Sequence, residues 1–152
     1  MLKKIILLII ILSFSHCGYT SIYTNLNNSD LNIKIGEFQG DQDINNSLRR
    51  KFKRFSNNNL DKEIFLIDIK SSYKKIIASK DSTGSASDYK IENNIEFIVR
   101  SNDKTENITY SESVNMTKME DVFEEKQYEL TIKENFASSV SEKLIQRLSI
   151  SK

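Results

Sequence analysis

Few side chains in this sequence of 152 residues are suited to covalent catalysis. The chain holds one histidine and one cysteine, His16 and Cys17, which are adjacent near the N-terminus. A Ser-His-Asp triad, a Cys-His pair or a histidine-ligated metal site needs an imidazole inside the folded domain. None of the four glycines falls in GxGxxG or GxxxxGKS/T, so no phosphate-cradling loop is predicted. A carboxylate pair of the glycosidase type is the remaining option, but no such pair is marked by apolar surroundings. We therefore expect a binding protein, not an enzyme, with no cofactor and no metal.

The first residues have the pattern of a bacterial export signal. Lys3 and Lys4 precede the apolar run Ile5–Leu12, which is typical of a signal peptide. The run is much shorter than the roughly 20 apolar residues of a transmembrane helix. Removal of residues 1–16 takes away the histidine and two lysines, and changes 22 basic and 21 acidic side chains to 20 and 21. A nearly neutral mature chain argues against nucleic acid as a partner, since nucleic-acid-binding domains are usually basic.

Cys17 is the expected first residue of the mature chain. The segment Phe14-Ser15-His16-Cys17 resembles a bacterial lipobox, although His16 takes the place of the usual small residue. The alternative is that the signal is cut elsewhere and Cys17 is an ordinary thiol. Two or more acyl chains anchor a protein stably where one does not, and bacterial lipoproteins, which this N-terminus resembles, carry three. Gly18 in place of Asp after the cysteine points, in that class, to the outer membrane.

The mature chain is predicted to consist of a tether and one domain. Residues 17–30 are polar, so we expect a lipidated N-terminus and tether there, followed by a domain at 31–152. Alternation over Leu31–Ile35 indicates a strand. A helix capped by Asp41 or Asp43 and ended by Asn57–Asn59 follows. Its apolar stripe is Ile44, Leu48, Phe52 and Phe55, and its opposite, basic face is Arg49, Arg50, Lys53 and Arg54.

Three further strands and a second helix complete the predicted domain. The first strand is Ile64–Tyr73, extended through Ile76 and Ile77, with a loop at Ser82–Ser87. A hairpin of residues 89–99 and 108–116 follows, and then capping-box spacing at Thr117–Glu120. A helical stripe starts at Ile132 and recurs every four residues, at Phe136, Val140, Leu144 and Leu148. This order predicts an α+β two-layer sandwich, with two helices packed on a four-stranded, mostly antiparallel sheet.

Basic side chains gather near two predicted connections. Lys74, Lys75 and Lys80 precede the Ser82–Ser87 loop, and Arg100 and Lys104 flank the hairpin turn. If both connections lie at one end of the sheet, these residues form one patch for an anionic lipid. Each surface cation then contributes about 1 kcal/mol. The alternative is a set of ordinary solvated surface charges.

The chain resembles the LptE family of lipopolysaccharide-assembly lipoproteins. The resemblance rests on three groups of residues: Cys17-Gly18-Tyr19 with Tyr23; the Leu31–Ile35 strand before an Asp-led helix; and the tail Tyr128-Glu129, Asn135-Phe136-Ala137 and Leu144-Ile145-Gln146-Arg147-Leu148. It implies two helices on a four-stranded sheet, as predicted above from the element order. It also implies a lipid-anchored outer-membrane protein that plugs the β-barrel LptD and binds lipopolysaccharide.

Under this resemblance, basic residues at the loops contact lipid phosphates. The candidates are Lys74, Lys75, Arg100 and Lys104. An auxiliary lipoprotein of another lipid-transport complex, facing the periplasm, is the first alternative. A lipid-anchored hydrolase is the second, and it would need a buried carboxylate pair.

Overall fold

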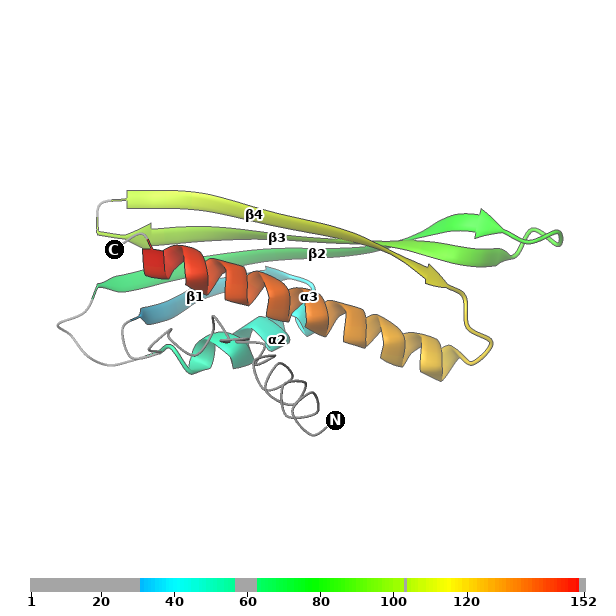
Figure 1. Cartoon of the computed structure of the whole chain (residues 1–152), viewed down its shortest axis with the longest axis horizontal. Helices are drawn as coiled ribbons and strands as arrows, with labels where there is room; N and C mark the ends of the chain where they lie inside the picture. Colours follow the sequence, from blue (N-terminus) through cyan, green and yellow to red (C-terminus); the bar gives the residue numbers. More distant parts are fainter. Residues whose placement is uncertain (1–30, 57–62, 103, 151–152) are drawn as a thin grey trace, which may run out of the picture.

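The computed structural model describes residues 31–56, 63–102 and 104–150. The predicted signal peptide, Cys17 and the tether lie outside this part of the chain. The elements follow in the order β1 (Asn32–Gly40), α2 (Gln42–Lys53), β2 (Ile64–Lys80), β3 (Ala86–Ser101), β4 (Lys104–Thr117) and α3 (Val122–Ile150). Both helices cover one face of the sheet and leave the other face open (Figure 1). The predicted α+β two-layer sandwich is confirmed.

The sheet is mixed, with strand order β1-β2-β3-β4. β1 and β2 are parallel, because the chain returns through α2 to the same end of the sheet. The pairings of β2 with β3 and of β3 with β4 are antiparallel, as expected for two hairpins.

Alternating apolar residues build the core between the layers. Phe65, Ile67 and Ile69 lie on the helix-facing side of β2 and are at most 4% exposed. Phe52 of α2 packs edge-on against Phe97 of β3, with ring centroids 6.1 Å apart. A second, smaller cluster further along the sheet consists of Ile91, Met116 and Ile132. The core therefore follows the long axis of the molecule.

Several element boundaries differ from the sequence prediction. α3 begins at Val122, ten residues before Ile132, because the Asp121 carboxylate accepts hydrogen bonds from the backbone N–H groups of Phe123 and Glu124. The capping box predicted at Thr117–Glu120 is therefore wrong.

The ends of β1, α2 and the β2–β3 loop also differ. β1 continues to Gly40, past a register irregularity between Ile35 and Phe38. Asp41 caps α2, as one of the two predicted alternatives, and the helix ends at Lys53. The predicted end at Asn57–Asn59 lies outside the described residues. The β2–β3 loop is confined to residues 81–85, because the strands extend further than predicted.

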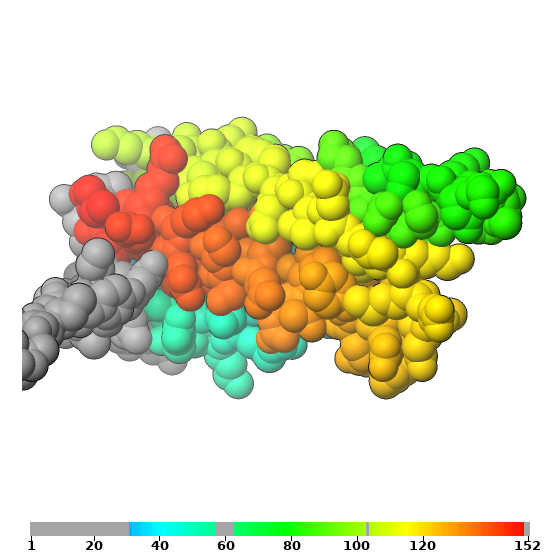
Figure 2. Space-filling view, turned by 45° about the vertical axis from the view of Figure 1, so that its right-hand side comes forward, coloured from blue at the N-terminus to red at the C-terminus, as the bar shows by residue number. Residues whose placement is uncertain are grey.

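The strands differ greatly in length, and this makes one end of the sheet narrow. β1 pairs with β2 only as far as Gly40–Ser71, whereas β2 and β3 stay paired to Lys80–Ala86. We call residues 72–94 of this pair the distal hairpin. Its tip projects beyond the helices and the other strands (Figures 1 and 2).

Candidate functional site

The two adjacent lysines Lys74 and Lys75 lie on opposite faces of β2. Lys74 is exposed on the open face, where it lines a shallow polar depression together with Glu92 and Ser113. It forms no ion pair with the part of the chain that the structure describes. Strand alternation places Lys75 on the helix-facing side. Of these two lysines, only Lys74 is thus available at the open face.

Lys75 is engaged within the protein. Its Nζ lies 2.5 Å from Glu125 Oε1, also contacts Glu129, and sits 4.0 Å from the ring centroid of Tyr89. Burial lowers the pKa of Lys75, but the two carboxylates outweigh burial and leave it above the ordinary value. Lys75 therefore ties α3 to the distal hairpin.

Arg100 and Lys104 lie at the other end of the sheet. Arg100 forms an ion pair with Asp68, at 2.6 Å between Nη2 and Oδ2. The backbone N–H of Glu37 and the Arg100 guanidinium hold the pKa of Asp68 below its ordinary value. Lys104 is the first residue of β4, is exposed, and has no ion pair among the described residues.

The four candidates do not form one patch. Lys74 is eight residues further along β2 than Leu66, the register partner of Arg100, and eight strand residues span about 26 Å. Two consecutive hairpins turn at opposite ends of a sheet, so the two connections cannot meet. The predicted shared patch is wrong, and lipid contact at each separate residue stays a prediction.

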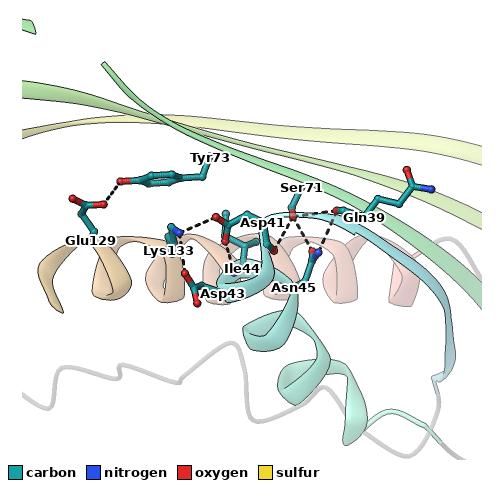
Figure 3. A network of polar contacts seen from close by, with 9 residues as sticks. All are labelled: Gln39, Asp41, Asp43, Ile44, Asn45, Ser71, Tyr73, Glu129 and Lys133. Carbon is teal, nitrogen blue, oxygen red and sulfur yellow. Dashed lines mark hydrogen bonds and ion pairs between the residues drawn. The ribbon is translucent and has the colours of Figure 1, made fainter. Parts of the chain in front are cut away.

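A partly buried polar network, which the sequence analysis missed, joins both layers (Figure 3). Lys133 of α3 is only 9% exposed, and its Nζ lies 2.7 Å from Asp41 Oδ2 and 2.9 Å from Asp43 Oδ2. The ammonium also sits 4.2 Å from the ring centroid of Tyr73. Burial lowers the pKa of Lys133, but the two aspartates raise it by more, so the lysine stays charged.

The same network continues along the sheet in both directions. The Tyr73 hydroxyl donates to Glu129 Oε2 at 2.6 Å, and burial together with this carboxylate raises the pKa of Tyr73. The Ser71 hydroxyl lies 2.8 Å from Asn45 Oδ1, and the Asn45 amide donates to the Gln39 carbonyl at 3.2 Å. These bonds connect β1, α2, β2 and α3.

The sequence carried one signal for this network. Lys133 stands three residues before Phe136 and seven before Val140, so it falls on the buried stripe of α3. A lysine on such a stripe needs a carboxylate partner. The residues in the network hold the layers together.

The described residues contain neither a membrane-spanning helix nor a metal-binding cluster. No helix within 31–56, 63–102 and 104–150 has the length and apolar character needed to cross a bilayer. The same residues contain no group of three or more His, Cys, Asp and Glu side chains placed to hold a metal ion.

Comparisons with known proteins define the class of fold. No protein-family model and no curated protein matches the chain. The structure is similar to rare lipoprotein B from Shewanella oneidensis, with a TM-score of 0.55 and 11% identity over 76% of this chain and 96% of that chain. It is also similar to a minor lipoprotein from Acinetobacter baumannii, with a TM-score of 0.50 and 10% identity over 73% and 93%. The described domain thus has the α+β sandwich fold of these two small lipoproteins.

Proposed function

We propose that the protein is a lipid-anchored outer-membrane lipoprotein of the LptE type. It partners an LptD-like β-barrel in lipopolysaccharide assembly, as plug and lipid-binding subunit. The observation that carries the proposal is the fold, which is similar to that of rare lipoprotein B, a member of the LptE family. The lipobox-like segment ending at Cys17 independently supports the lipid anchor.

The surface of the sandwich suits a hydrated barrel lumen. Seven consecutive outward positions of β4 carry small, uncharged polar side chains: Thr105, Asn107, Thr109, Ser111, Ser113, Asn115 and Thr117. The lumen of an outer-membrane barrel is polar and hydrated, so such a face can lie there without exposing apolar side chains to water. The chain enters the domain at β1, at the end of the sheet that holds Arg100 and Lys104.

Two of the four cations are suited to meet lipid phosphates. Lys74 and Lys104 are exposed and have no ion pair among the described residues, whereas Lys75 and Arg100 form ion pairs with carboxylates. Glu92 is the register partner of Lys74 on β3 but does not form an ion pair with it. A phosphate that approached Lys75 or Arg100 would compete with those carboxylates. The function is binding, and no bond is broken.

Gentle detergent extraction of the full-length lipoprotein tests the partner. A large, heat-modifiable barrel protein should co-purify, and mass spectrometry of the mature N-terminus should find acyl chains on Cys17. Co-purification of an inner-membrane transporter without a barrel would instead support an auxiliary lipoprotein of another lipid-transport complex.

A lipid-binding measurement tests the second part of the proposal. The double variant Lys74→Ser/Lys104→Ser should bind purified lipopolysaccharide more weakly and with a smaller salt dependence than the parent. The matched control is Lys126→Ser/Lys143→Ser, which removes two exposed lysines of α3. Equal binding by both double variants throughout a salt titration would contradict the assignment of Lys74 and Lys104.

A further inference from the structure

Part of β2 has no neighbouring strand on the side of β1 among the described residues. The pairing of β1 with β2 stops at Ser71, while β2 continues, paired with β3 alone, to Lys80 (Figure 1). Ser72–Lys80 therefore forms a free edge, in line with β1 and beginning where β1 ends.

The backbone groups on this edge are directed into the open space. The Ser71 carbonyl accepts a hydrogen bond from Asp41 N on the β1 side, at 3.4 Å. Because successive residues of a strand present their N–H and C=O groups to opposite edges, those of Tyr73, Lys75 and Ile77 also point to this side. They are available to pair with another extended chain, as at any unprotected sheet edge.

The side chains of the free edge are apolar and cationic. Ile76 and Ile77 lie on opposite faces of the strand and are 45% and 51% exposed. Lys74 and Lys80 are exposed and form no ion pair with described residues. An added strand would place one row of its side chains beside Lys74 and Ile76 on the open face, and the other row against Ile77 on the helix-facing side.

The opposite edge of the sheet differs in character. β4 carries small polar side chains on its open face. On its helix-facing side the exposed residues are the charged Lys104, Glu106 and Glu112, while the apolar residues Ile108 and Met116 are buried and Tyr110 and Val114 are partly buried. An incoming strand therefore gains apolar contact at β2 that β4 does not offer.

We propose that the free edge Ser72–Lys80 binds an extended segment of a partner protein as an added strand in line with β1. The segment alternates acidic residues, which lie on the open face beside Lys74, with apolar residues, which lie on the helix-facing side against Ile77. Pairing of two copies of this edge would bring Lys74 and Lys80 of both copies together, so charge disfavours self-association. The proposal is independent of the lipid anchor and of the barrel.

The test uses the full mature lipoprotein in nanodiscs and a blocked nine-residue peptide of alternating valine and glutamate. The peptide should bind at about 1 mM or below and should slow hydrogen exchange at Tyr73, Lys75 and Ile77. A peptide of alternating valine and lysine should bind at least about tenfold more weakly. Protection of these amides by the acidic peptide alone would support the proposal.

Two variants at one position separate strand pairing from side-chain contact. Ile77→Pro removes an N–H on the free edge and keeps the β2–β3 ladder, since proline is tolerated when its missing N–H faces an open edge. It should weaken peptide binding by about tenfold or more, whereas Ile77→Thr should weaken it by only about threefold. The β2–β3 amides must keep their protection in both variants, which shows that the hairpin is intact.

Three results would overturn the proposal. The first is no binding of the valine–glutamate peptide, with unchanged exchange in residues 72–80. The second is equal loss of binding in Ile77→Pro and Ile77→Thr, which would indicate an apolar contact without strand pairing. The third is a dimer in sedimentation that Ile77→Pro dissociates, which would assign the edge to a second copy of this chain. A failed barrel co-purification would leave all three measurements unaffected.

Discussion

Lys133 is the side chain that most directly joins the two layers. It carries a positive charge on the buried stripe of α3, which is otherwise apolar except for Ser141, and two aspartates at the start of α2 compensate it. Asp41 also caps α2, since its Oδ1 accepts the backbone N–H of Ile44 at 3.0 Å. One carboxylate therefore serves the local helix and the contact between helices.

Replacement of Lys133 by methionine should destabilise the domain by about 3 kcal/mol, because it leaves Asp41 half-buried without its cation. Urea denaturation of the Lys133→Met variant measures the effect. Lys126→Met is the matched control, since Lys126 is an exposed lysine of the same helix, and its effect should stay within about 0.5 kcal/mol. Similar stability of the two variants would show that the ion pairs contribute little.

Glu125 gives the domain a specific acid sensitivity. Its carboxylate accepts from Lys75 and from Met119 N, and these hydrogen bonds hold the pKa of Glu125 below the ordinary 4.5. A carboxyl group with a depressed pKa stabilises the fold above its unfolded pKa, and this stabilisation is lost as the pH falls through the folded pKa.

The Glu125→Gln variant should therefore be less stable than the parent at neutral pH. The difference should shrink as the pH falls from about 5 to about 3. Chemical denaturation at a series of pH values measures it. For the exposed neighbour, Glu124→Gln, we expect no comparable pH dependence. A difference for Glu125→Gln that stays constant down to pH 3 would contradict the role assigned to this carboxylate.

At the scale of the elements, the corner between β1 and α2 depends on one glycine. Gly40 has φ +96°, and a Cβ atom there would lie 1.7 Å from the Ser71 carbonyl oxygen. Gly84, in the β2–β3 loop, has φ +85°, but a Cβ there would meet no atom within 4 Å. Both glycines have a positive φ, but only Gly40 lies against the backbone of a neighbouring strand.

Gly84→Ala should cost about 1 kcal/mol, from the left-handed backbone alone. Gly40→Ala should cost at least about 3 kcal/mol, because the corner must also shift away from β2. Thermal or urea unfolding of both variants gives the comparison. Equal losses would mean that the corner adjusts freely, and that the approach of Gly40 to Ser71 is not essential.

Much of the element order was predictable, because the hydrophobic period differs between strands and helices. Ile44, Leu48 and Phe52 on α2 and the alternating residues of β2 and β3 fixed the layers. The start of α3 was not predictable in this way, because Tyr128, Leu130 and Ile132 also fit a strand period. The Asp121 cap and the ion pair between Glu129 and Lys75 of β2 stabilise the helix there.

The candidate site was less predictable than the fold. Period-2 alternation alone places Lys74 and Lys75 on opposite faces, and successive hairpins turn at opposite ends, so both patterns already argue against a shared patch. The partly buried network joins residues about 90 positions apart, such as Lys133 and Asp43. Such pairings depend on how the helices cross the sheet, which local patterns do not specify.

At the scale of the whole molecule, two regions of different stability should coexist. The main cluster around Ile67 and Phe97 lies between both helices and the sheet, while neither of the described helices, α2 and α3, covers the tip of the distal hairpin. Segments with few buried apolar contacts open at lower free energy than the core.

Native-state hydrogen exchange should therefore find amides of Ile76 and Lys90 opening at least about 2 kcal/mol more easily than those of Ile67 and Phe97. Their exchange should also depend little on denaturant, as expected for local opening. A single, uniform opening free energy over the whole sheet would contradict this and would indicate one cooperative unit.

The different rise per residue of helix and strand also restricts where residues can be inserted or deleted. A helix rises about 1.5 Å per residue and a strand about 3.3 Å. Under α3, an insertion of two residues in each strand would need about four in the helix to keep both layers in register. The hairpin tip at residues 81–85 has no such constraint. Insertions and deletions among proteins of this fold should therefore accumulate at that tip, and the helix-covered length should stay nearly constant.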